Sequence, residues 1–597
     1  MDPTLTISPD AGGLNARAFA DSGAVPCGCP LCLGIATVVE TGEPFGQSYL
    51  NADERAAGAV GGKVSFSIDR AGLQMVGFNP VTMAPEPGWG GVAGQAYTVT
   101  YAFRSSAPIT MPSETEGFQR FNATQIAWTE QALQGWADVA NIRFVRIGSG
   151  TDGEAAYSND ASILLGNFTS GADGSAGFAN FPGNPAASSA SGDVWIAITR
   201  GTNGMPEMGN YGAHVLVHEI GHAIGLMHPG DYNAEEDTTI TYAEHAEYYE
   251  DSRQYSVMSY FSEANTGAAY GPGRYAAAPQ LDDIRAAQYE YGPNMSTRTG
   301  DTVYGFNSNA GRDWFVATSS STRLVFAVWD AGGVDTFDFS RYGQNQLIDL
   351  REGHFSNVGS LVGNVAVAQG AKIENAIGGL GADTIHGNAL NNLIEGGSGA
   401  DRVFAGGGSD TILGGEGGGY LRGEDGADSI LGGSGFDDIH GNTGNDTASG
   451  GAGHDWVVGG KDNDILFGNS GDDIVFGNLG DDTCVGGDGA DTVRGGQGAD
   501  SLMGDGGADF MSGDRGDDTI VGGGGADLFH FFADAGMDRV LDFSAAEGDR
   551  VNLAPGTAYS VSQVGADTVI AIAGTGDRMV LVNVQLGALP DGWIFGA

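Results

Sequence analysis

A nonapeptide repeat that runs without interruption from Gly378 to His530 is the feature that most constrains the fold. Its unit reads Gly-Gly-x-Gly-x-Asp-x-apolar-x and occurs 17 times, with Asp at position six in 15 units; Asn392 and Gly419 are the exceptions. Glycines permit tight turns with positive φ. The apolar residue at position eight then lies in a short strand and points inward. This pattern is typical of a parallel β-roll that binds calcium, whereas a flexible glycine linker would show no fixed Asp and apolar phases.

The position-six carboxylates predict a ladder of calcium sites. If two nonapeptides make one coil, equivalent Asp residues stack at about 4.8 Å, and each like-charged pair costs on the order of 0.8 kcal/mol in water. A hard cation such as Ca²⁺, bound by carboxylate and carbonyl oxygens, reverses this repulsion. We therefore expect several structural calcium ions and a segment that folds only in millimolar calcium. The predicted ligands are Asp383, Asp401, Asp410, Asp428, Asp437, Asp446, Asp455, Asp464, Asp473, Asp482, Asp491, Asp500, Asp509, Asp518 and Asp527.

Composition excludes several classes of partner. The chain has 26 Lys and Arg against 75 Asp and Glu, a net charge of −49, so nucleic acids and anionic membrane surfaces are repelled. No apolar run reaches the ~18 residues of a membrane span. The N-terminus has no basic and apolar stretches of a Sec-type signal peptide, which predicts export by another route. We expect the chain to be a monomer.

The stretch from His218 to His228 predicts a catalytic zinc site. His218 and His222 stand at i and i+4, so on a helix both imidazoles share one face, and Glu219 lies beside them. His228 would turn away on a continued helix, but Gly225 provides a break that lets it join. Three histidines leave a fourth position open, as in a catalytic rather than a structural site. A helix with buried core histidines would explain neither Glu219 nor the break.

Several motifs of the chain resemble those of a known protein family. The HExxHxxGxxH motif with the later Ser256–Tyr260 Met-turn resembles the metzincins. Together with the repeat and with Ser296–Asn307 and Ile373–Gly379, the chain is similar to the serralysin-type metalloproteases over roughly residues 60 to 597. The resemblance implies an α+β metzincin zinc-protease domain followed by an all-β parallel roll of RTX nonapeptides.

The resemblance also implies roles and a cellular route. His218, His222 and His228 would bind Zn²⁺, and Glu219 would be the general base in peptide hydrolysis by a zinc-activated water. Tyr260 would ligate zinc at rest and then stabilise the oxyanion, with Met258 as the apolar floor. The relatives leave Gram-negative bacteria through type I secretion machinery that reads an uncleaved C-terminal signal, which implies an extracellular enzyme.

Five domains follow from these patterns. We expect a propeptide-like segment over 1–55, the catalytic domain over 56–295 and a β lead-in over 296–377. The roll spans 378–530, and 531–597 is a β cap with the secretion signal. A capping box at Asn122 predicts the start of a helix whose Ile126, Leu133 and Trp136 face the core. The stretch 176–181 is either a substrate-docking edge strand or an ordinary sheet edge.

Three cysteines in the propeptide-like segment, Cys27, Cys29 and Cys32, depart from the family pattern. One thiolate is a candidate latency ligand for zinc, two could form a disulfide, or the cluster has no role in the mature enzyme. Cys484 takes an inward position eight and is expected to be a buried thiol.

The length of the roll leaves one alternative function open. Seventeen repeats exceed what is usual for the family and suggest a calcium-dependent cell-surface or surface-layer protein in which proteolysis is subsidiary. The intact Glu219 and histidines argue against an inactive protease domain. An RTX lipase would need a Gly-x-Ser-x-Gly elbow, and a pore-forming toxin would need long apolar helices; we find neither in the sequence.

Overall fold

The computed structural model describes residues 49–76, 88–112, 115–171, 176–183, 185–187, 189–232 and 240–596. The described chain divides into two compact units, Gln47–Asp425 and Gly426–Ala597, which are taken in turn. This division does not test the predicted domain limits at residues 55, 295, 377 and 530, which stay predictions. No helix within the described ranges is long and apolar enough to cross a membrane.

A five-stranded sheet forms the base of the N-terminal part of the first unit. Its order is β5 (Ile142–Arg146), β3 (Tyr97–Phe103), β6 (Ile163–Phe168), β9 (Val194–Ala197) and β8 (Gly177–Ala179). The first four strands are parallel, and β8 pairs antiparallel with β9. Strands β6 and β9 are buried along their whole length, as expected of parallel strands that are covered on both faces. The prediction of an edge strand near 176–181 is confirmed.

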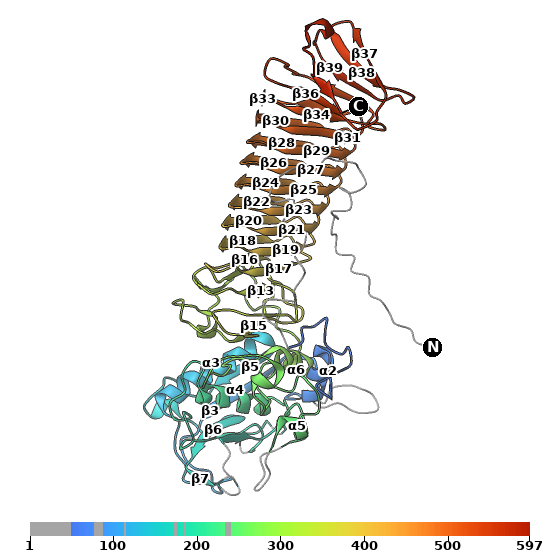
Figure 1. Cartoon of the computed structure of the whole chain (residues 1–597). Helices are drawn as coiled ribbons and strands as arrows, with labels where there is room; N and C mark the ends of the chain where they lie inside the picture. The colour runs from blue at the N-terminus through green and yellow to red at the C-terminus, as the bar shows by residue number, and fades with distance from the viewer. Residues whose placement is uncertain are drawn as a thin grey trace, which may run out of the picture. The chain divides into compact units, whose positions relative to one another are not determined.

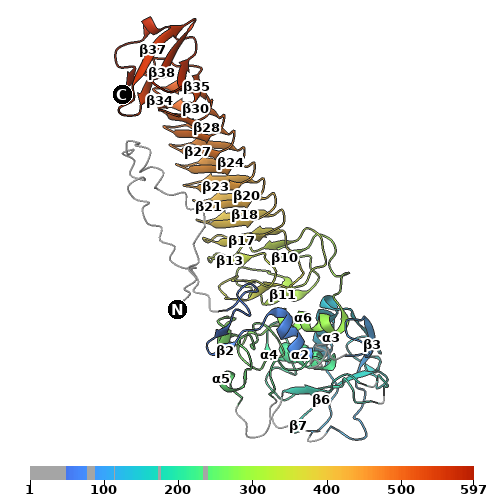
Figure 2. The ribbon, with the colours of Figure 1, turned by 90° about the vertical axis from the view of Figure 1, so that its right-hand side faces the viewer.

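Helices accompany this sheet, namely α2 (Ile68–Val76), α3 (Ala123–Val139), α4 (Tyr211–Ala223), the short α5 (Tyr242–His245) and α6 (Leu281–Tyr291). Two of them contact its strands: α3 contacts β5, and α4 contacts β8 and β9. Helix α3 packs against α4 and α6, and α6 also packs against α2 (Figure 2). The capping box at Asn122 is confirmed, and Ile126, Leu133 and Trp136 are buried as predicted. Short strand pairs, β1 (Ala59–Val60) with β2 (Lys63–Val64) and β4 (Thr115–Glu116) with β7 (Ser170–Gly171), complete this part.

Parallel strands follow in the rest of the first unit. One series is β10 (Val303–Gly305), β12 (Thr336–Asp338), β16 (Asn375–Ile377), β18 (Leu393–Ser398) and β20 (Thr411–Glu416). The other is β13 (Leu347–Asp349), β17 (Thr384–Asn388), β19 (Arg402–Gly406) and β21 (Tyr420–Asp425). Segments between these strands in the sequence form a separate small sheet, in the order β11 (Phe326–Val328), β15 (Val365–Val367) and β14 (Phe355–Ser356).

The second unit is a parallel roll closed by a β cap, with its strands stacked as rungs in Figure 1. One sheet runs β22 (Ser429–Ser434), β24 (Thr447–Ala452), β26 (Ile465–Ser470), β28 (Thr483–Asp488), β30 (Ser501–Gly507), β32 (Thr519–Val521), β35 (Met537–Val540), β39 (Arg578–Leu581), β38 (Asp567–Ile572) and β37 (Tyr559–Val564), with β33 (Gly524–Gly525) beside β30. The other runs β23 (Asp438–Thr443), β25 (Trp456–Lys461), β27 (Ile474–Leu479), β29 (Thr492–Gln497), β31 (Phe510–Arg515), β34 (Leu528–Phe531), β36 (Arg550–Leu553) and β40 (Ile594–Phe595).

The register of the roll confirms two nonapeptides per coil. Residues pair with partners 18 positions later, as in Leu466 with Cys484. Position-eight side chains point inward and are almost fully buried, and Cys484 is a buried free thiol as predicted. Gly451 has a φ of +107°, and a Cβ there would lie 2.3 Å from the carbonyl oxygen of Gly433. The backbone of the preceding coil therefore leaves no room for a side chain at this turn.

We predict that an inward residue of the roll stabilises it far more than an outward one. Ile439 is fully buried in β23, and Ile439→Ala would leave a cavity between coils, lowering the free energy of unfolding in calcium by about 2–5 kcal/mol. Leu431 in β22 is 45% exposed, so Leu431→Ala is the matched control and should change it by less than ~0.5 kcal/mol. Denaturant titration followed by circular dichroism measures both, and equal losses would contradict the assigned faces.

Candidate metal centres

Helix α4 and the turn after it bring three histidines together. His218 and His222 lie one helical turn apart, α4 ends at Ala223, and Gly225 adopts a φ of +116°. The predicted helix break is thus confirmed, and it returns His228 to the same face. The Nε2 atoms of His222 and His228 are 3.1 Å apart, and those of His228 and His218 are 3.4 Å apart. The three rings form a cluster with metal-ligand spacing.

Backbone carbonyls fix the tautomer of each ring. The Nδ1 atom of His218 lies 2.8 Å from the carbonyl oxygen of Val257, and that of His222 lies 2.7 Å from that of Leu226. His228 Nδ1 lies 2.9 Å from the Tyr232 carbonyl. A carbonyl only accepts, so each Nδ1 carries the proton and donates, and a neutral ring then keeps a lone pair on Nε2.

Burial keeps two of these rings neutral. Removal from water lowers the pKa of His218 to about 4 and holds the pKa of His222 well below its usual range. At neutral pH the rings of His218 and His222 therefore each present an Nε2 lone pair to the cluster. Lone pairs that converge in this way favour a cation at the centre of the cluster.

The spacing suits zinc. Tetrahedral Zn²⁺ with Zn–N bonds of 2.0–2.1 Å requires nitrogen atoms about 3.3 Å apart. The observed Nε2 separations of 3.1 and 3.4 Å agree with that requirement, and all three donors are imidazoles, which zinc favours. The residues present therefore fit the metal that the motif predicts.

Glu219 directly follows His218 in α4, and its carboxyl group is buried. Its side chain is 5% exposed, and its Oε2 has no hydrogen-bond partner among the described residues. Burial raises the pKa of Glu219 to about 8. Strand β8 passes close by, since a Cβ on Gly177 would lie 2.9 Å from Glu219 Oε1. The absence of a side chain at Gly177 thus leaves room for the carboxylate beside the sheet edge.

The Met-turn packs against the same helix. Met258 is fully buried, and a Cβ on Gly221 would lie 2.4 Å from its Sδ, so the close approach requires glycine in α4. The ring of Tyr260 lies 4.4 Å from that of His228 and 6.0 Å from that of His218, measured between centroids. Tyr260 is 37% exposed and thus accessible at the cluster that the sequence predicted it to join.

Two buried aspartates that the sequence reading missed hold these loops. Asp283 Oδ2 accepts from the backbone N–H of Val257 at 2.7 Å, and its Oδ1 accepts from the Ser256 hydroxyl at 2.7 Å. Asp251 Oδ1 accepts from the hydroxyls of Tyr232 and Ser259, each at 2.7 Å. The one sequence signal for Asp283 is its place as an acidic residue in the first turn of α6, where it also accepts from the N–H of Gln280. Asp251 offers no comparable signal.

The roll holds a second class of candidate metal ligands. Along it, each Asp Oδ1 accepts from the backbone N–H of the residue 18 positions earlier, as in Asp446 N–H to Asp464 Oδ1 at 2.8 Å. The Oδ2 atoms are buried and have no hydrogen-bond partner among the described residues at Asp401, Asp446, Asp455, Asp464, Asp473, Asp482, Asp491, Asp500, Asp509, Asp518 and Asp527. Oriented carboxylate oxygens that lack a donor fit a hard cation such as Ca²⁺. Asp410, Asp428 and Asp437 occupy equivalent positions.

The ladder differs at both ends from the sequence expectation. Asp383 accepts from the backbone of Gln346 and of Gly379, so both its oxygens are satisfied by the protein. Asn392 donates from Nδ2 to the Glu374 carbonyl at 2.7 Å and needs no cation. At the other end the buried carboxyl of Asp538 lies beside that of Asp518, where the two negative charges would favour a cation. Asp538 escaped the repeat count because it follows Asp518 by 20 residues rather than 18.

Burial raises the pKa of the ladder carboxyls in the absence of a cation. The pKa rises to about 8 for Asp464, to about 7 for Asp401 and to about 6 for Asp509, with burial as the largest cause. Asp538 reaches about 9 through burial and the neighbouring charge of Asp518. The three N-terminal cysteines predicted as latency thiols, Cys27, Cys29 and Cys32, lie outside the described residues.

We predict that Asp283 supports metal binding without touching the metal. Asp283→Ala would free the Val257 segment whose carbonyl orients His218, and loss of such support typically weakens zinc affinity by about 10–100-fold. The control is Asp160→Ala, which removes an exposed aspartate. Competition with a chromophoric zinc chelator gives both affinities, and an unchanged value for Asp283→Ala would contradict the role.

Comparisons with known proteins agree with this arrangement. The family described as Matrixin matches residues 98–252, and the family described as Peptidase M10 serralysin C terminal matches residues 293–564. An extracellular lipase LipA from Serratia marcescens aligns with 37% of this chain and 40% of its own at a TM-score of 0.17 and 17% identity, too low to indicate a shared overall fold.

The curated relatives are proteases. Serralysin C of Dickeya chrysanthemi is 46% identical over 343 residues, which cover 56% of this chain and 67% of the relative. Serralysin G of the same organism is 46% identical over 57% of this chain and 69% of its own length. Metallopeptidase AprA of Pseudomonas marginalis is 44% identical over 56% and 68%. The chain therefore belongs to the serralysin family of metalloendopeptidases.

Proposed function

We propose that this chain is a secreted zinc endopeptidase whose roll is folded by calcium. The observation that carries the proposal is the convergence of three Nε2 atoms whose lone pairs are fixed by carbonyl acceptors on the opposite ring nitrogens. His218, His222 and His228 would hold Zn²⁺, which supplies a lowered pKa for water and polarisation of the scissile carbonyl when bound.

Glu219 is the general base in this proposal. Its carboxylate is buried and its Oε2 has no protein donor among the described residues, so a proton from the attacking water is the group it can accept. It would then return that proton to the leaving amine. A dication near it would lower the raised pKa and keep the carboxylate ionised at neutral pH. The Tyr260 hydroxyl would donate to the oxyanion that forms during attack.

Strand β8 would align the substrate. Among the described strands it is the edge of its sheet and pairs only with β9, which would leave its outer backbone groups available to an extended peptide. Main-chain hydrogen bonds of this kind select an extended conformation rather than a particular sequence. Because Gly177 lies against Glu219, a peptide added to this edge would pass the proposed base.

The route out of the cell completes the proposal. The relatives come from Gram-negative bacteria, and the resemblance implies type I secretion of a chain whose roll folds only on meeting external calcium. The buried carboxylates support that dependence, because without a cation they oppose the folded state.

The direct test removes the base and keeps the metal ligands. Glu219→Gln, refolded in calcium and assayed on casein, should lower kcat by at least about 10²-fold at unchanged zinc content. The control Glu207→Gln makes the same substitution at an exposed glutamate and should leave kcat as in wild type. Activity of Glu219→Gln within a few-fold of wild type would overturn the assignment.

Without calcium, the folded roll should become less stable as the pH rises. The ladder carboxyls have a raised pKa when folded without cation, so the folded state binds more protons than the unfolded one between about pH 4 and 8, and its stability falls as pH rises through that window. After exhaustive calcium removal, we expect more β-structure by circular dichroism at pH 5 than at pH 8. Saturating calcium should cancel the difference at pH 8. Equal β-content at both pH values without calcium would show that the carboxyls do not control folding.

A further inference from the structure

The chain turns sharply after α4, and this α4 turn (residues 224–227) serves two of the three histidines. The carbonyl oxygen of Leu226 lies 2.7 Å from Nδ1 of His222 and accepts its hydrogen bond. The positive φ of Gly225 returns the chain so that His228 reaches the cluster. A shift of the α4 turn would therefore move one imidazole through its hydrogen bond and another through the backbone.

Two aromatic side chains hold the end of α4 from outside the cluster. The last carbonyl groups of a helix have no partner within the helix. The carbonyl oxygen of Ala223, the last residue of α4, accepts from Trp89 Nε1 at 2.8 Å, and that of Ile224 accepts from the Tyr291 hydroxyl at 2.5 Å. All four residues are buried, so these carbonyls depend on the two side chains. Burial raises the pKa of Tyr291, which keeps its hydroxyl protonated as a donor.

The segment that carries Trp89 fits closely between α6 and the α4 turn. The backbone N–H of Trp89 donates to Tyr291 Oη at 3.2 Å, and that of Gly88 donates to Glu290 Oε2. A Cβ on Gly88 would lie 2.5 Å from Tyr291 Oη and 2.9 Å from the carbonyl oxygen of Ile224. The Tyr291 hydroxyl thus accepts from this segment and donates to the α4 turn, which joins the two.

Helix α6 thereby contacts both loops that orient the metal ligands. In its first turn, Asp283 accepts from the N–H of Val257, whose carbonyl orients the first histidine of the cluster. At its last residue, Tyr291 donates to the α4 turn, in which the Leu226 carbonyl orients the second histidine. One helix therefore sets the distance between the two accepting loops, and with it the relative position of two imidazoles.

We propose that Tyr291 and Trp89 are positioning residues of the zinc site. They hold the carbonyl groups at the end of α4, and this keeps the α4 turn in the conformation that orients His222 and returns His228. Their effect reaches the metal only through the α4 turn, as is common for residues that support metal ligands from outside. The proposal rests on the proposed zinc function, but the two can fail separately.

Substitutions that remove single donors test the role. Tyr291→Phe removes one hydroxyl group and keeps the ring, and Trp89→Phe removes the indole N–H. In full-length protein with calcium, Tyr291→Phe should weaken zinc binding by about 10–100-fold, and Trp89→Phe should weaken it in the same direction. Competition with a chromophoric chelator measures both affinities. Visible absorption of the Co²⁺-loaded protein reports ligand geometry, and its bands should shift in both variants.

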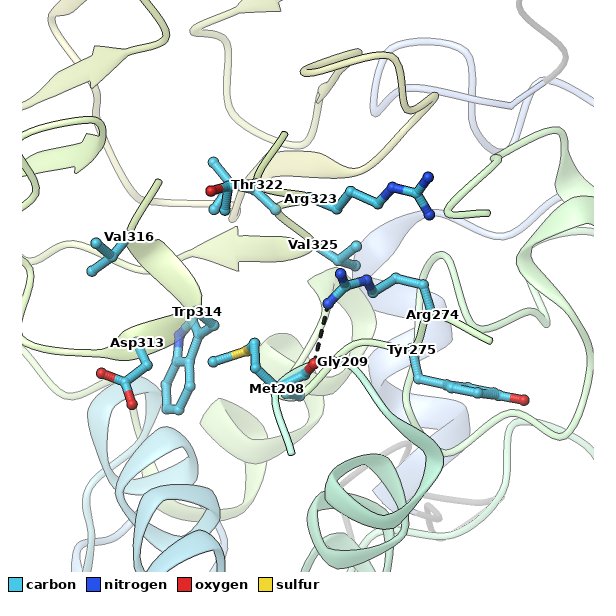
Figure 3. A pocket seen from close by; sticks show the side chains of 12 residues that line it. Met208, Gly209, Arg274, Tyr275, Asp313, Trp314, Val316, Thr322, Arg323 and Val325 are labelled. Carbon is cyan, nitrogen blue, oxygen red and sulfur yellow. Dashed lines mark hydrogen bonds between the residues drawn. The ribbon is translucent and has the colours of Figure 1, made fainter. Parts of the chain in front are cut away.

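The matched control is Tyr342→Phe. The hydroxyl of the buried Tyr342 also donates to one backbone carbonyl, that of Thr322, at 2.8 Å. Thr322 lines a small pocket with Trp314 and Arg323, and no residue of the α4 turn lines that pocket (Figure 3). Tyr342→Phe should lower the denaturant midpoint of unfolding about as much as Tyr291→Phe does. It should leave zinc affinity and the cobalt bands as in wild type.

The outcomes separate positioning from general stability. Unchanged zinc affinity and cobalt bands in both Tyr291→Phe and Trp89→Phe would overturn the proposal. An equal loss of zinc affinity in Tyr342→Phe would overturn it as well, because any buried hydroxyl would then have the same effect. If Tyr291→Phe does not fold, Trp89→Phe decides the question. Wild-type protein that binds no zinc would instead overturn the proposed function, and the positioning role with it.

Discussion

Three hydrogen bonds from imidazole Nδ1 atoms to backbone carbonyls are the constraint on which the site depends. They leave the Nε2 lone pairs of His218, His222 and His228 directed at one point, an arrangement that suits the zinc ion we propose. The accepting carbonyls belong to the Met-turn and to the segment after α4, so the metal geometry is determined by loops as much as by the helix. Asp283 and Asp251 in turn hold those loops.

The roll applies the same principle on a larger scale. In most of its coils an Asp side chain uses one oxygen to accept from the coil before, and from Asp446 to Asp527 the other oxygen is buried without a donor among the described residues. Buried carboxylates are unfavourable unless a cation or a proton compensates them, which is why we propose that calcium folds the roll at neutral pH. Asp383 and Asn392, which the protein satisfies by itself, mark where that requirement begins. In this proposal, the end of the ladder at Asp383 and Asn392 would need no calcium, and the coils that follow would need it.

Local patterns predicted much of this molecule, and distant partners account for what they missed. The spacing of the histidines with Gly225 predicted the cluster, and the nonapeptide period predicted coils of 18 residues, because both are short-range geometry. The role of Asp283 depends on a contact with Val257, 26 residues earlier, that no spacing rule contains. Asp538 was missed because an insertion of two residues breaks the period, and Gln346 satisfies Asp383 from outside the repeat.

X-ray absorption at the zinc edge of the full-length, zinc-loaded protein tests the central claim most directly. The account predicts three imidazole nitrogen atoms at about 2.0–2.1 Å from one zinc ion per chain. It also predicts that His228→Ala, which removes the ligand returned by the turn at Gly225, lowers the number of imidazole ligands to two. A wild-type spectrum with fewer than three imidazole ligands would contradict it.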